Sequence, residues 1–333
     1  MSLLHPMKLF TSDNYAPEII KTIRNARHEV AIIATTFRAD DDRSEAIIEE
    51  LCRAADRGVA VSVHADTFTY LEPKEFILFS PKRQPSRAVQ AIKLERRLKG
   101  HGIQFYWLGR KANVILTGRT HTKWIVVDDI VYSFGGLNLD NESLTNIDYM
   151  FKVRDAKLAE TILAEHARIR RADRGGAGIR NHKYKLDEST DVLFDGGLIG
   201  SSLIYRRTVA LAKEAEYITL VSQYCPTGPL VRILKAKHAT VYYNHWRNAS
   251  SLNRALIGLG MLTAKSTTAY KHNTYLHAKF AIFTMPSGDK VAISGSHNFM
   301  FGSGVVGTRE VAIETADPRI IRQLEKFCEE YVA

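Results

Sequence analysis

One stretch of the chain occurs twice, and this repeat constrains the fold more than any other feature. The first copy reads HTKWIVVDDIVYSFGGLN, from His121 to Asn138, and the second reads HAKFAIFTMPSGDKVAISGSHN, from His277 to Asn298. Each copy has a His-x-Lys pair, an apolar run, a turn, a second apolar run and a Gly-Gly-x-Asn or Gly-Ser-x-Asn ending. The pattern predicts two hairpins that differ in loop length, and hence a chain built from two related halves.

The segments around the two hairpins repeat in the same order, which indicates an internal duplication. Before each hairpin the pattern is strand, helix and strand, a βαβ arrangement that requires parallel pairing. These elements are predicted at 29–37, 43–57 and 59–64 in the first half, and at 217–223, 229–236 and 240–244 in the second. A strand and a helix follow each hairpin, at 149–153 and 156–171, and at 311–314 and 318–331.

The repeated side chains are suited to chemistry on a phosphodiester. A neutral imidazole can attack phosphorus, and a protonated imidazole can protonate the departing oxygen. Lysine and asparagine side chains can stabilise the charge on the non-bridging oxygens, which a metal ion would otherwise do. In a strand, the His and the Lys of each pair point the same way. We therefore expect the candidate catalytic residues to meet in one cleft: His121, Lys123, Asn138, His277, Lys279 and Asn298.

An acidic residue in an apolar context follows each copy. Asp148 lies in IDYMFKV, and Glu310 lies in REVAIET. Such an acid could accept the Nδ1–H of a catalytic histidine, fix its tautomer and direct its Nε2 toward the substrate. We predict that Asp148 binds His121 and that Glu310 binds His277.

Each part of the motif, taken singly, has an ordinary structural explanation. A His-x-Lys pair is common at a solvated strand edge, and Gly-Gly-x-Asn is usually a turn. A repeated hairpin can also be a structural duplication without activity. The recurrence of all the parts, twice and in the same order, favours a catalytic site.

The two copies resemble the HKD signature of the phospholipase D superfamily. The resemblance rests on His121-x-Lys123 with Asp128 and Gly-Gly-x-Asn138, and on His277-x-Lys279 with Gly-Ser-x-Asn298. It implies an α/β fold of two duplicated α/β/α sandwich halves related by a pseudo-twofold axis, with mixed, mostly parallel sheets and both His-Lys pairs at the seam. We expect one half at 1–170, a Gly-rich basic linker at 171–190 and the other half at 191–333.

The second copy departs from the signature at one position. Asp128 ends the first apolar run of the first copy, whereas Thr284 stands at the corresponding place in the second, and Asp289 lies at the far end of the longer loop. We interpret Asp128 as a supporting residue at the hairpin turn, away from the His and the Lys, so that its replacement is a local structural change. Ser296, inside the second Gly-Ser-x-Asn, is the other supporting candidate.

Charge and composition limit the partners and the compartment. The formal net charge of +10 favours a polyanionic partner, either nucleic acid or an anionic membrane, although a generally basic surface would give the same value. The three cysteines are far apart and form no Cys-x-x-Cys, which indicates a reducing compartment and no thiolate zinc site. No signal-peptide-like or membrane-spanning apolar run occurs. We expect a cytoplasmic protein, peripheral to the inner face of the membrane, with no metal or other cofactor.

One segment combines apolar, aromatic and basic residues in a way that suits a lipid interface. It runs from Phe68 to Arg87, and its candidate contacts for the membrane or the substrate are Phe76, Phe79, Lys82 and Arg83. The alternative is a loop packed on the domain.

These patterns lead to one preferred function and two alternatives. Within the superfamily, the chain looks most similar to bacterial cardiolipin synthase-like phosphatidyltransferases. We expect a metal-independent phosphodiesterase or phosphatidyltransferase acting on a phospholipid through a phosphohistidine, with His121 as nucleophile and His277 as acid and base, and with no oligomer required. The alternatives are a nuclease of the same superfamily and an inactive membrane- or DNA-binding module.

Overall fold

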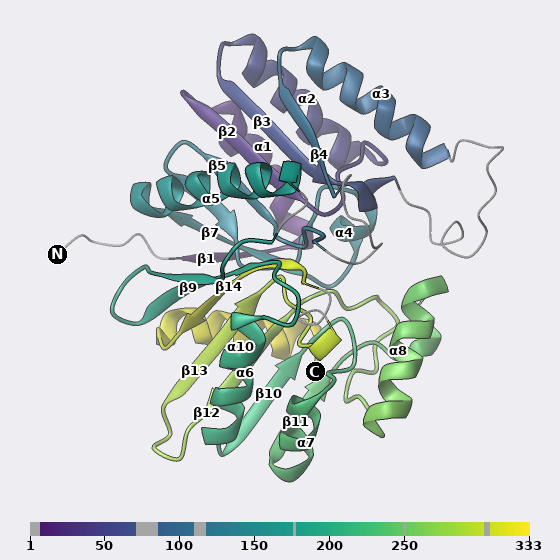
Figure 1. Cartoon of the computed structure of the whole chain (residues 1–333), viewed down its shortest axis with the longest axis vertical. Coiled ribbons are helices and arrows are strands. Elements are labelled where there is room, and N and C mark those ends of the chain that lie inside the picture. The colour runs from purple at the N-terminus through teal and green to yellow at the C-terminus, as the bar shows by residue number, and fades with distance from the viewer. Residues whose placement is uncertain (1–6, 71–85, 110–117, 176–177, 250, 303–306) are drawn as a thin grey trace.

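The computed structural model describes residues 7–70, 86–109, 118–175, 178–249, 251–302 and 307–333. Within them, each half of the chain forms a seven-stranded mixed sheet with helices packed on it (Figure 1). The α/β class and the duplicated halves predicted from the sequence are confirmed.

The first sheet has the strand order β1-β7-β6-β5-β2-β3-β4. Its strands are β1 (Lys8–Thr11), β2 (Glu29–Ala34), β3 (Ala60–Asp66), β4 (Gln104–Leu108), β5 (Trp124–Val127), β6 (Ile130–Ser133) and β7 (Tyr149–Arg154). The helical elements of this half are α1 (Ser12–Arg24), α2 (Asp42–Asp56), η1 (Thr67–Thr69), α3 (Ser86–Gly100), α4 (Asn141–Thr145) and α5 (Ala156–Gly175).

The second sheet has the order β11-β10-β12-β13-β14-β9-β8, which repeats the first in its central part. Its strands are β8 (His182–Lys185), β9 (Thr190–Gly196), β10 (Tyr217–Val221), β11 (His238–Tyr242), β12 (Phe280–Thr284), β13 (Lys290–Gly295) and β14 (Arg309–Thr315). The helical elements are α6 (Leu203–Glu214), α7 (Pro229–Ala236), η2 (Trp246–Asn248), α8 (Ser251–Ala264) and α10 (Pro318–Tyr331). The hairpin β12–β13 takes the place of β5–β6, and β9 takes the place of β1.

The expectation of mostly parallel sheets needs correction. Parallel pairing occurs only between β2 and β3, between β3 and β4, and between β10 and β11. All other pairings of the named strands are antiparallel. The strands of a motif hairpin and the strand that follows run antiparallel because the chain reverses direction between them. A parallel pair needs a crossover helix, and α2, α3 and α7 serve in this way between the strands of the three parallel pairs.

Local signals determine where helices begin. Asp41 caps α2, because its carboxylate accepts a hydrogen bond from the backbone N–H of Ser44 at 2.8 Å while Ser44 Oγ accepts one from the Asp41 N–H at 3.1 Å. Asp317 caps α10 in the same way through the N–H of Arg319, and Pro318 occupies the first helical position. These caps explain why the two helices start close to the positions that the sequence predicted.

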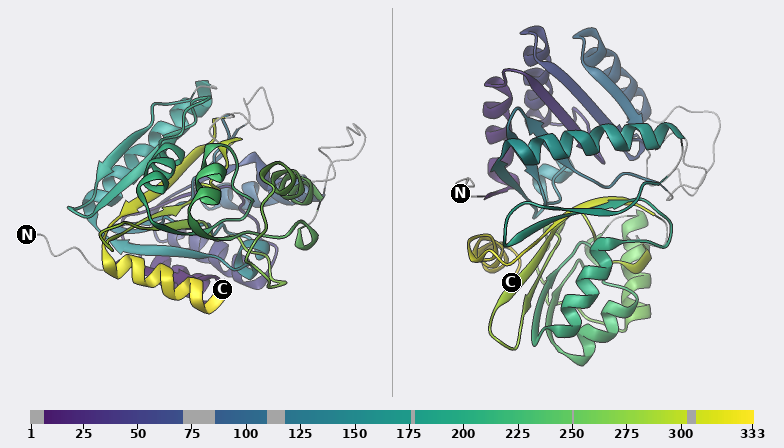
Figure 2. Two further views of the ribbon diagram at one scale, coloured as in Figure 1. Left: turned by 90° about the horizontal axis from the view of Figure 1, so that it is seen from below. Right: turned by 60° about the vertical axis from the view of Figure 1, so that its left-hand side comes forward.

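The two halves share a buried core. Trp124 and Phe151 of the first sheet belong to the same buried cluster as Phe280 and Ile313 of the second, and Phe327 of α10 joins them. Helices α1 to α3 cover the outer face of the first sheet, and α6 and α7 cover the outer face of the second (Figure 2). Because the inner faces are packed together, the seam that carries both motifs is a fixed part of the fold.

Residues 171–190, expected as a linker, contain regular structure. Helix α5 continues to Gly175, and β8 pairs in antiparallel fashion with β9. The ring of His182 stacks on Phe194 with 4.7 Å between centroids, which explains why this basic segment is held to the sheet. The sequence patterns missed β1, β8 and β9; the proposed limits of the halves stay a prediction.

Candidate functional site

Each motif histidine is fixed by backbone from the other half. The N–H of His121 donates to the carbonyl of Arg309 at 2.9 Å, and the N–H of His277 donates to the carbonyl of Ile147 at 2.9 Å. Both His-x-Lys pairs lie directly before β5 and β12. The sequence pattern predicted them inside these strands, and this prediction was wrong. The reason is that their N–H groups bind the opposite half and do not continue the sheet.

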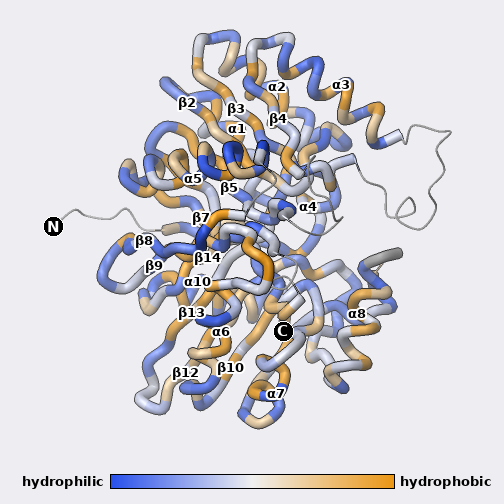
Figure 3. Tube along the Cα trace, viewed as in Figure 1, coloured by the Kyte–Doolittle hydropathy of each residue, from blue (hydrophilic) through white to orange (hydrophobic). Residues whose placement is uncertain are grey.

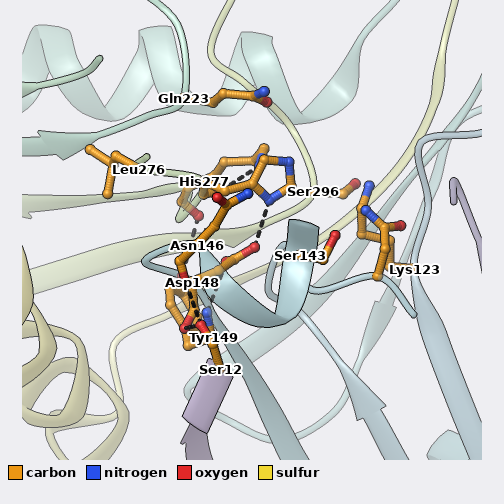
Figure 4. Close-up of polar contacts among 12 residues, drawn as sticks. Ser12, Lys123, Ser143, Asn146, Asp148, Tyr149, Gln223, Leu276, His277 and Ser296 are labelled. Atoms are coloured by element: carbon orange, nitrogen blue, oxygen red, sulfur yellow. Dashed lines mark hydrogen bonds and ion pairs between the residues drawn. The ribbon is translucent and has the colours of Figure 1, made fainter. Parts of the chain in front are cut away.

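The supporting acids are exchanged between the halves, so our predicted pairing was wrong. Asp148 Oδ2 lies 2.6 Å from Nδ1 of His277 (Figure 4), and Glu310 Oε2 lies 3.1 Å from Nδ1 of His121. The strand that follows each hairpin turns its first residues toward the seam, where the facing histidine comes from the other half. The sequence predicted that these two acids bind the motif histidines, but it could not show which histidine each acid binds.

The hydrogen bonds define the histidine tautomers. His121 Nδ1 faces two acceptors, the Glu310 carboxylate and the carbonyl oxygen of Ser296 at 3.0 Å, so Nδ1 carries the proton. His277 Nδ1 faces the Asp148 carboxylate, so it also carries the proton. Each ring therefore keeps the lone pair on Nε2, which is the atom a nucleophile or a general base needs.

The Gly-Gly-x-Asn and Gly-Ser-x-Asn endings make room for the acids. A Cβ on Gly136 would lie 2.5 Å from Asp148 Oδ2, so only glycine leaves space for that carboxylate. In the second copy Ser296 stands at this place, and its hydroxyl donates to Glu310 Oε2. Cβ atoms on Gly135 and Gly295 would lie 2.0 Å and 2.2 Å from the carbonyls of Tyr149 and Val311. The first glycine of each ending thus allows the strand carrying the acid to approach.

The two lysines are buried close to each other. Lys123 Nζ donates to Thr35 Oγ1 at 2.9 Å and to the carbonyl of His121 at 2.7 Å, and Lys279 Nζ donates to the carbonyl of His277. Burial, followed by the charge of Lys279, lowers the pKa of Lys123 to about 7, and burial lowers the pKa of Lys279 to about 8. A bound anion between the two ammonium groups would favour their charged forms.

The pKa values of the two histidines and of Glu310 are lowered by their surroundings. Burial, and then Lys123, lowers the pKa of His121, while burial and Lys279 lower the pKa of His277 to about 4. Burial raises the pKa of Glu310, but neighbouring groups led by His121 outweigh it and hold that pKa at about 2. At neutral pH both imidazoles are therefore neutral, and Glu310 is a carboxylate.

The two motif asparagines differ in their surroundings. Asn138 Oδ1 accepts hydrogen bonds from the N–H groups of Thr35 and Thr36 at 3.0 and 3.3 Å, which connects the motif ending to the end of β2. Asn298 is held through its backbone, since its carbonyl accepts from Ser222 Oγ at 2.9 Å. Its side-chain Oδ1 is buried without a hydrogen-bond partner among the residues that the structure describes.

The position of Asp128 agrees with a supporting role. Its carboxylate accepts hydrogen bonds from the N–H groups of Arg27, His28 and Glu29, at 2.8 to 3.0 Å, and so it fixes the start of β2. At the corresponding place Thr284 uses its backbone carbonyl, which accepts from the N–H of Glu216 at 2.8 Å. The Asp289 carboxylate instead accepts from Ser287 Oγ. The contact that the Asp128 side chain makes in the first half is thus replaced in the second by a backbone hydrogen bond at the end of β12.

Two buried residues that the sequence patterns did not indicate position the motif loops. Asp66 at the end of β3 accepts from the N–H of Thr120 at 2.9 Å, and Asn244 just after β11 accepts from the N–H of Leu276 at 2.8 Å. Each therefore holds the residue that immediately precedes a motif histidine. Only the location of a polar residue at the end of a parallel strand could have pointed to them.

His297 is not exposed to a substrate. Its ring is buried and its Nδ1 accepts from the N–H of Phe299 at 2.9 Å. The predicted interface residues Phe76, Phe79, Lys82 and Arg83 lie outside the described residues. Within the described part of the chain, no group of three or more His, Cys, Asp or Glu side chains is arranged to hold a metal. No helix in those same ranges has the length and apolar content to cross a bilayer.

Comparisons with known proteins agree with this architecture. The sequence profile of a family described as cardiolipin synthase, PLD-like domain, matches residues 19–170. A comparison with curated protein sequences found no match. Among solved structures, phosphatidylserine synthase from Haemophilus influenzae Rd KW20 superposes with a TM-score of 0.71 at 14% identity, over 97% of this chain and 85% of that chain. Polyphosphate kinase from Porphyromonas gingivalis superposes with a TM-score of 0.59 at 13% identity, over 96% of this chain and 49% of that chain.

The repeated motifs, the shared core and these similarities define a duplicated phospholipase D-like fold. Residues 19–170 therefore carry a phospholipase D-like domain, and the second half of the chain repeats its fold.

Proposed function

We propose that the protein is a phosphodiesterase or phosphatidyltransferase that acts on a glycerophospholipid through a phosphohistidine intermediate. The observation that carries the proposal is the crossed pairing of His121 with Glu310 and of His277 with Asp148 at one seam, beside two buried lysines. The choice of a phospholipid is supported by the similarity to phosphatidylserine synthase, which extends over 97% of the chain.

In the first step, Nε2 of His121 attacks phosphorus and the bond from phosphorus to the leaving oxygen breaks. The negative charge of the bound phosphodiester favours the protonated form of His277, and the leaving oxygen takes a proton from this imidazolium, which becomes neutral. We assign the attack to His121 because its side chain is 21% exposed, against 11% for His277. Lys123 and Lys279 stabilise the negative charge that the phosphoryl oxygens carry in the transition state.

In the second step, water or an alcohol attacks the phosphatidyl-histidine and its proton passes to His277. The bond from phosphorus to Nε2 of His121 breaks, and the product leaves as phosphatidic acid or as a new phosphodiester. Asp148 and Glu310 stabilise whichever imidazole is positively charged. Two histidines thus suffice for nucleophilic and acid–base catalysis.

The proposal is tested by incubating the purified protein in EDTA with three substrates: phosphatidylglycerol vesicles, phosphatidylcholine with an added alcohol, and single-stranded DNA. Mass spectrometry of the products should show cleavage or alcohol exchange of a phospholipid. His121→Ala should lower that rate by a factor of roughly 10³ or more, since the nucleophile is lost.

His101→Ala is the matched control, because this histidine also pairs with an acid, Asp56, but lies at the exposed end of α3, away from the seam. Its rate should equal that of the unmodified protein. Cleavage of DNA with no reaction of any phospholipid would exclude the lipid substrate and indicate the nuclease alternative. No reaction with any of the three substrates would contradict the proposal as a whole.

A further inference from the structure

The segment from 217 to 288 differs in charge from the rest of the chain. It contains no Asp or Glu, although the 36 acidic residues of the whole chain would place about eight in a stretch of this length. It contains eight basic residues: Arg232, Lys235, Lys237, Arg247, Arg254, Lys265, Lys271 and Lys279. Most of the net charge of +10 therefore arises in one continuous part of the second half.

Helix α8 lies within this acid-free segment and is apolar on two faces. Its inner face buries Ile257 and Ala264. Its outer face presents Leu259 and Leu262, which are 62% and 77% exposed. Figure 3 shows α8 as a largely apolar helix at the edge of the molecule. A helix that is apolar on both faces is suited to burial or to a lipid environment, and the outer face of α8 is exposed.

An aromatic and a basic residue flank this outer face. Trp246 of η2, an element packed against α8, is 39% exposed, and the Arg247 guanidinium lies 5.4 Å from the centre of its ring. Arg254, the one charged residue of α8, is exposed as well. Leucine and tryptophan on one surface, with arginines at its edge and no acids, is the composition of an interfacial helix.

Helix α8 is attached to the rim of the candidate site. Asn253 of α8 accepts a hydrogen bond from the Tyr224 hydroxyl at 2.8 Å. Tyr224 follows Gln223, whose side chain lies over His277 (Figure 4). Just beyond α8, Lys265 and Lys235 line a cavity of about 420 Å³ between α7, β11 and residues 265–269. The hydrogen bond from Tyr224 to Asn253 thus connects α8 with the segment that follows β10 near His277.

We propose that the outer face of α8, with Trp246, is a docking surface for anionic lipid bilayers. The inference rests on the proposed function in so far as a lipid substrate has to be reached at a membrane. The exposed leucines and the tryptophan enter the headgroup region, and the arginines and lysines around them bind lipid phosphates. Nucleic acid fits the charge but not the exposed leucines, because a phosphate backbone offers them no apolar partner.

The experiment compares the unmodified protein with Leu259→Ser/Leu262→Ser. Binding is measured by sedimentation with vesicles of phosphatidylglycerol and phosphatidylcholine, and with vesicles of phosphatidylcholine alone. The double variant should bind the anionic vesicles at least about tenfold more weakly, and salt should weaken the binding of the unmodified protein. Hydrolysis of the soluble diester bis(p-nitrophenyl) phosphate should not change, which also reports that the fold and the site are intact.

The matched control is Val89→Ser/Ile92→Ser, which removes two exposed apolar side chains, 36% and 40% exposed, from the basic helix α3 of the other half. Its vesicle binding should equal that of the unmodified protein. Undiminished vesicle binding by the α8 variant would overturn the inference, as would a loss of single-stranded DNA binding with vesicle binding retained. Vesicle binding through α8 without any phospholipid product would support the docking surface while rejecting the proposed function.

Discussion

At the scale of single residues, the exchange of the two acids has the largest consequence for function. Each carboxylate orients the histidine of the other half, so the two acids serve different chemical roles. In the proposed mechanism Glu310 supports the nucleophile and Asp148 supports the acid and base. Removing Glu310 should therefore slow formation of the phosphoenzyme, whereas removing Asp148 should slow both its formation and its breakdown.

We expect Asp148→Asn to slow both steps and Glu310→Gln to slow formation of the phosphoenzyme, each lowering turnover roughly 10²- to 10⁴-fold. With a p-nitrophenyl diester, whose leaving group departs without a proton, rapid quenching and intact-protein mass spectrometry should show phosphohistidine accumulating in Asp148→Asn but not in Glu310→Gln. Glu314→Gln is the control, because this carboxylate of the same strand, β14, binds Arg207 away from the seam. Accumulation in Glu310→Gln alone would reverse the assignment of the two histidines.

At the scale of elements, strand ends act as anchors for the motif loops. Asn244 is fully buried and binds three backbone groups: it donates to the carbonyls of Gln223 and Leu276 and accepts from the N–H of Leu276. The loop before His277 is thus held on one side by this amide and on the other by the backbone of Ile147, which forms an isolated parallel bridge with Leu276.

Asn244→Ala should destabilise the protein by about 1–3 kcal/mol, since it leaves buried backbone groups without partners. It should also lower turnover, because His277 follows Leu276 directly. Urea unfolding and initial rates measure the two effects. Asn248→Ala is the control: its side chain also donates to a carbonyl, that of His272, but it is exposed. The control should change stability by less than about 0.5 kcal/mol, and an equal loss in both variants would refute the anchoring role.

The helices and strands also show how much of the fold could be predicted from the sequence. Strong periodic patterns identified helices such as α2 and α10 closely, because their caps and apolar faces are local properties. The short strand β8 was missed because it is held by antiparallel pairing with β9 and by stacking of His182 on Phe194, contacts that no local pattern displays. Likewise His121 and Glu310 were both identified from the motif, but their pairing depends on how two distant segments cross.

At the scale of the whole molecule, buried histidines link stability to pH. His64 of β3 and His166 of α5 lie with ring centroids 3.9 Å apart, and Trp124 Nε1 donates to His166 Nδ1. Burial, and then neighbouring charges, lowers the pKa of His64 to about 2 and that of His166 to about 4. Below pH 6.5 the unfolded chain therefore binds protons that the folded chain does not, and stability falls as the pH falls.

Two buried acids act in the opposite direction. Burial raises the pKa values of Asp66 and Asp195 to about 6, so between pH 4 and 6 they stabilise the fold as protons bind. Four histidines have lowered values of about 4 or below and outnumber them: His64, His166, His277 and His297.

We expect the free energy of unfolding to fall between pH 7 and pH 5, with His166 alone contributing a loss on the order of 2 kcal/mol. His166→Gln keeps an acceptor for Trp124 and should make the pH dependence shallower, as measured by urea unfolding at both values. His101→Gln, at an exposed histidine, is the control and should leave the slope unchanged. A slope that His166→Gln leaves unaltered would refute this account.

The crossed acids also limit how a chain of this kind can be recombined. A chimaera that takes residues 1–175 from one protein and the remainder from a related one would inherit His121 and Asp148 from one parent, and their partners Glu310 and His277 from the other. The junction therefore leaves each seven-stranded sheet within one parent, yet it separates both histidines from the carboxylates they were matched with. Successful hybrids must match their parents at the seam, however well each half folds.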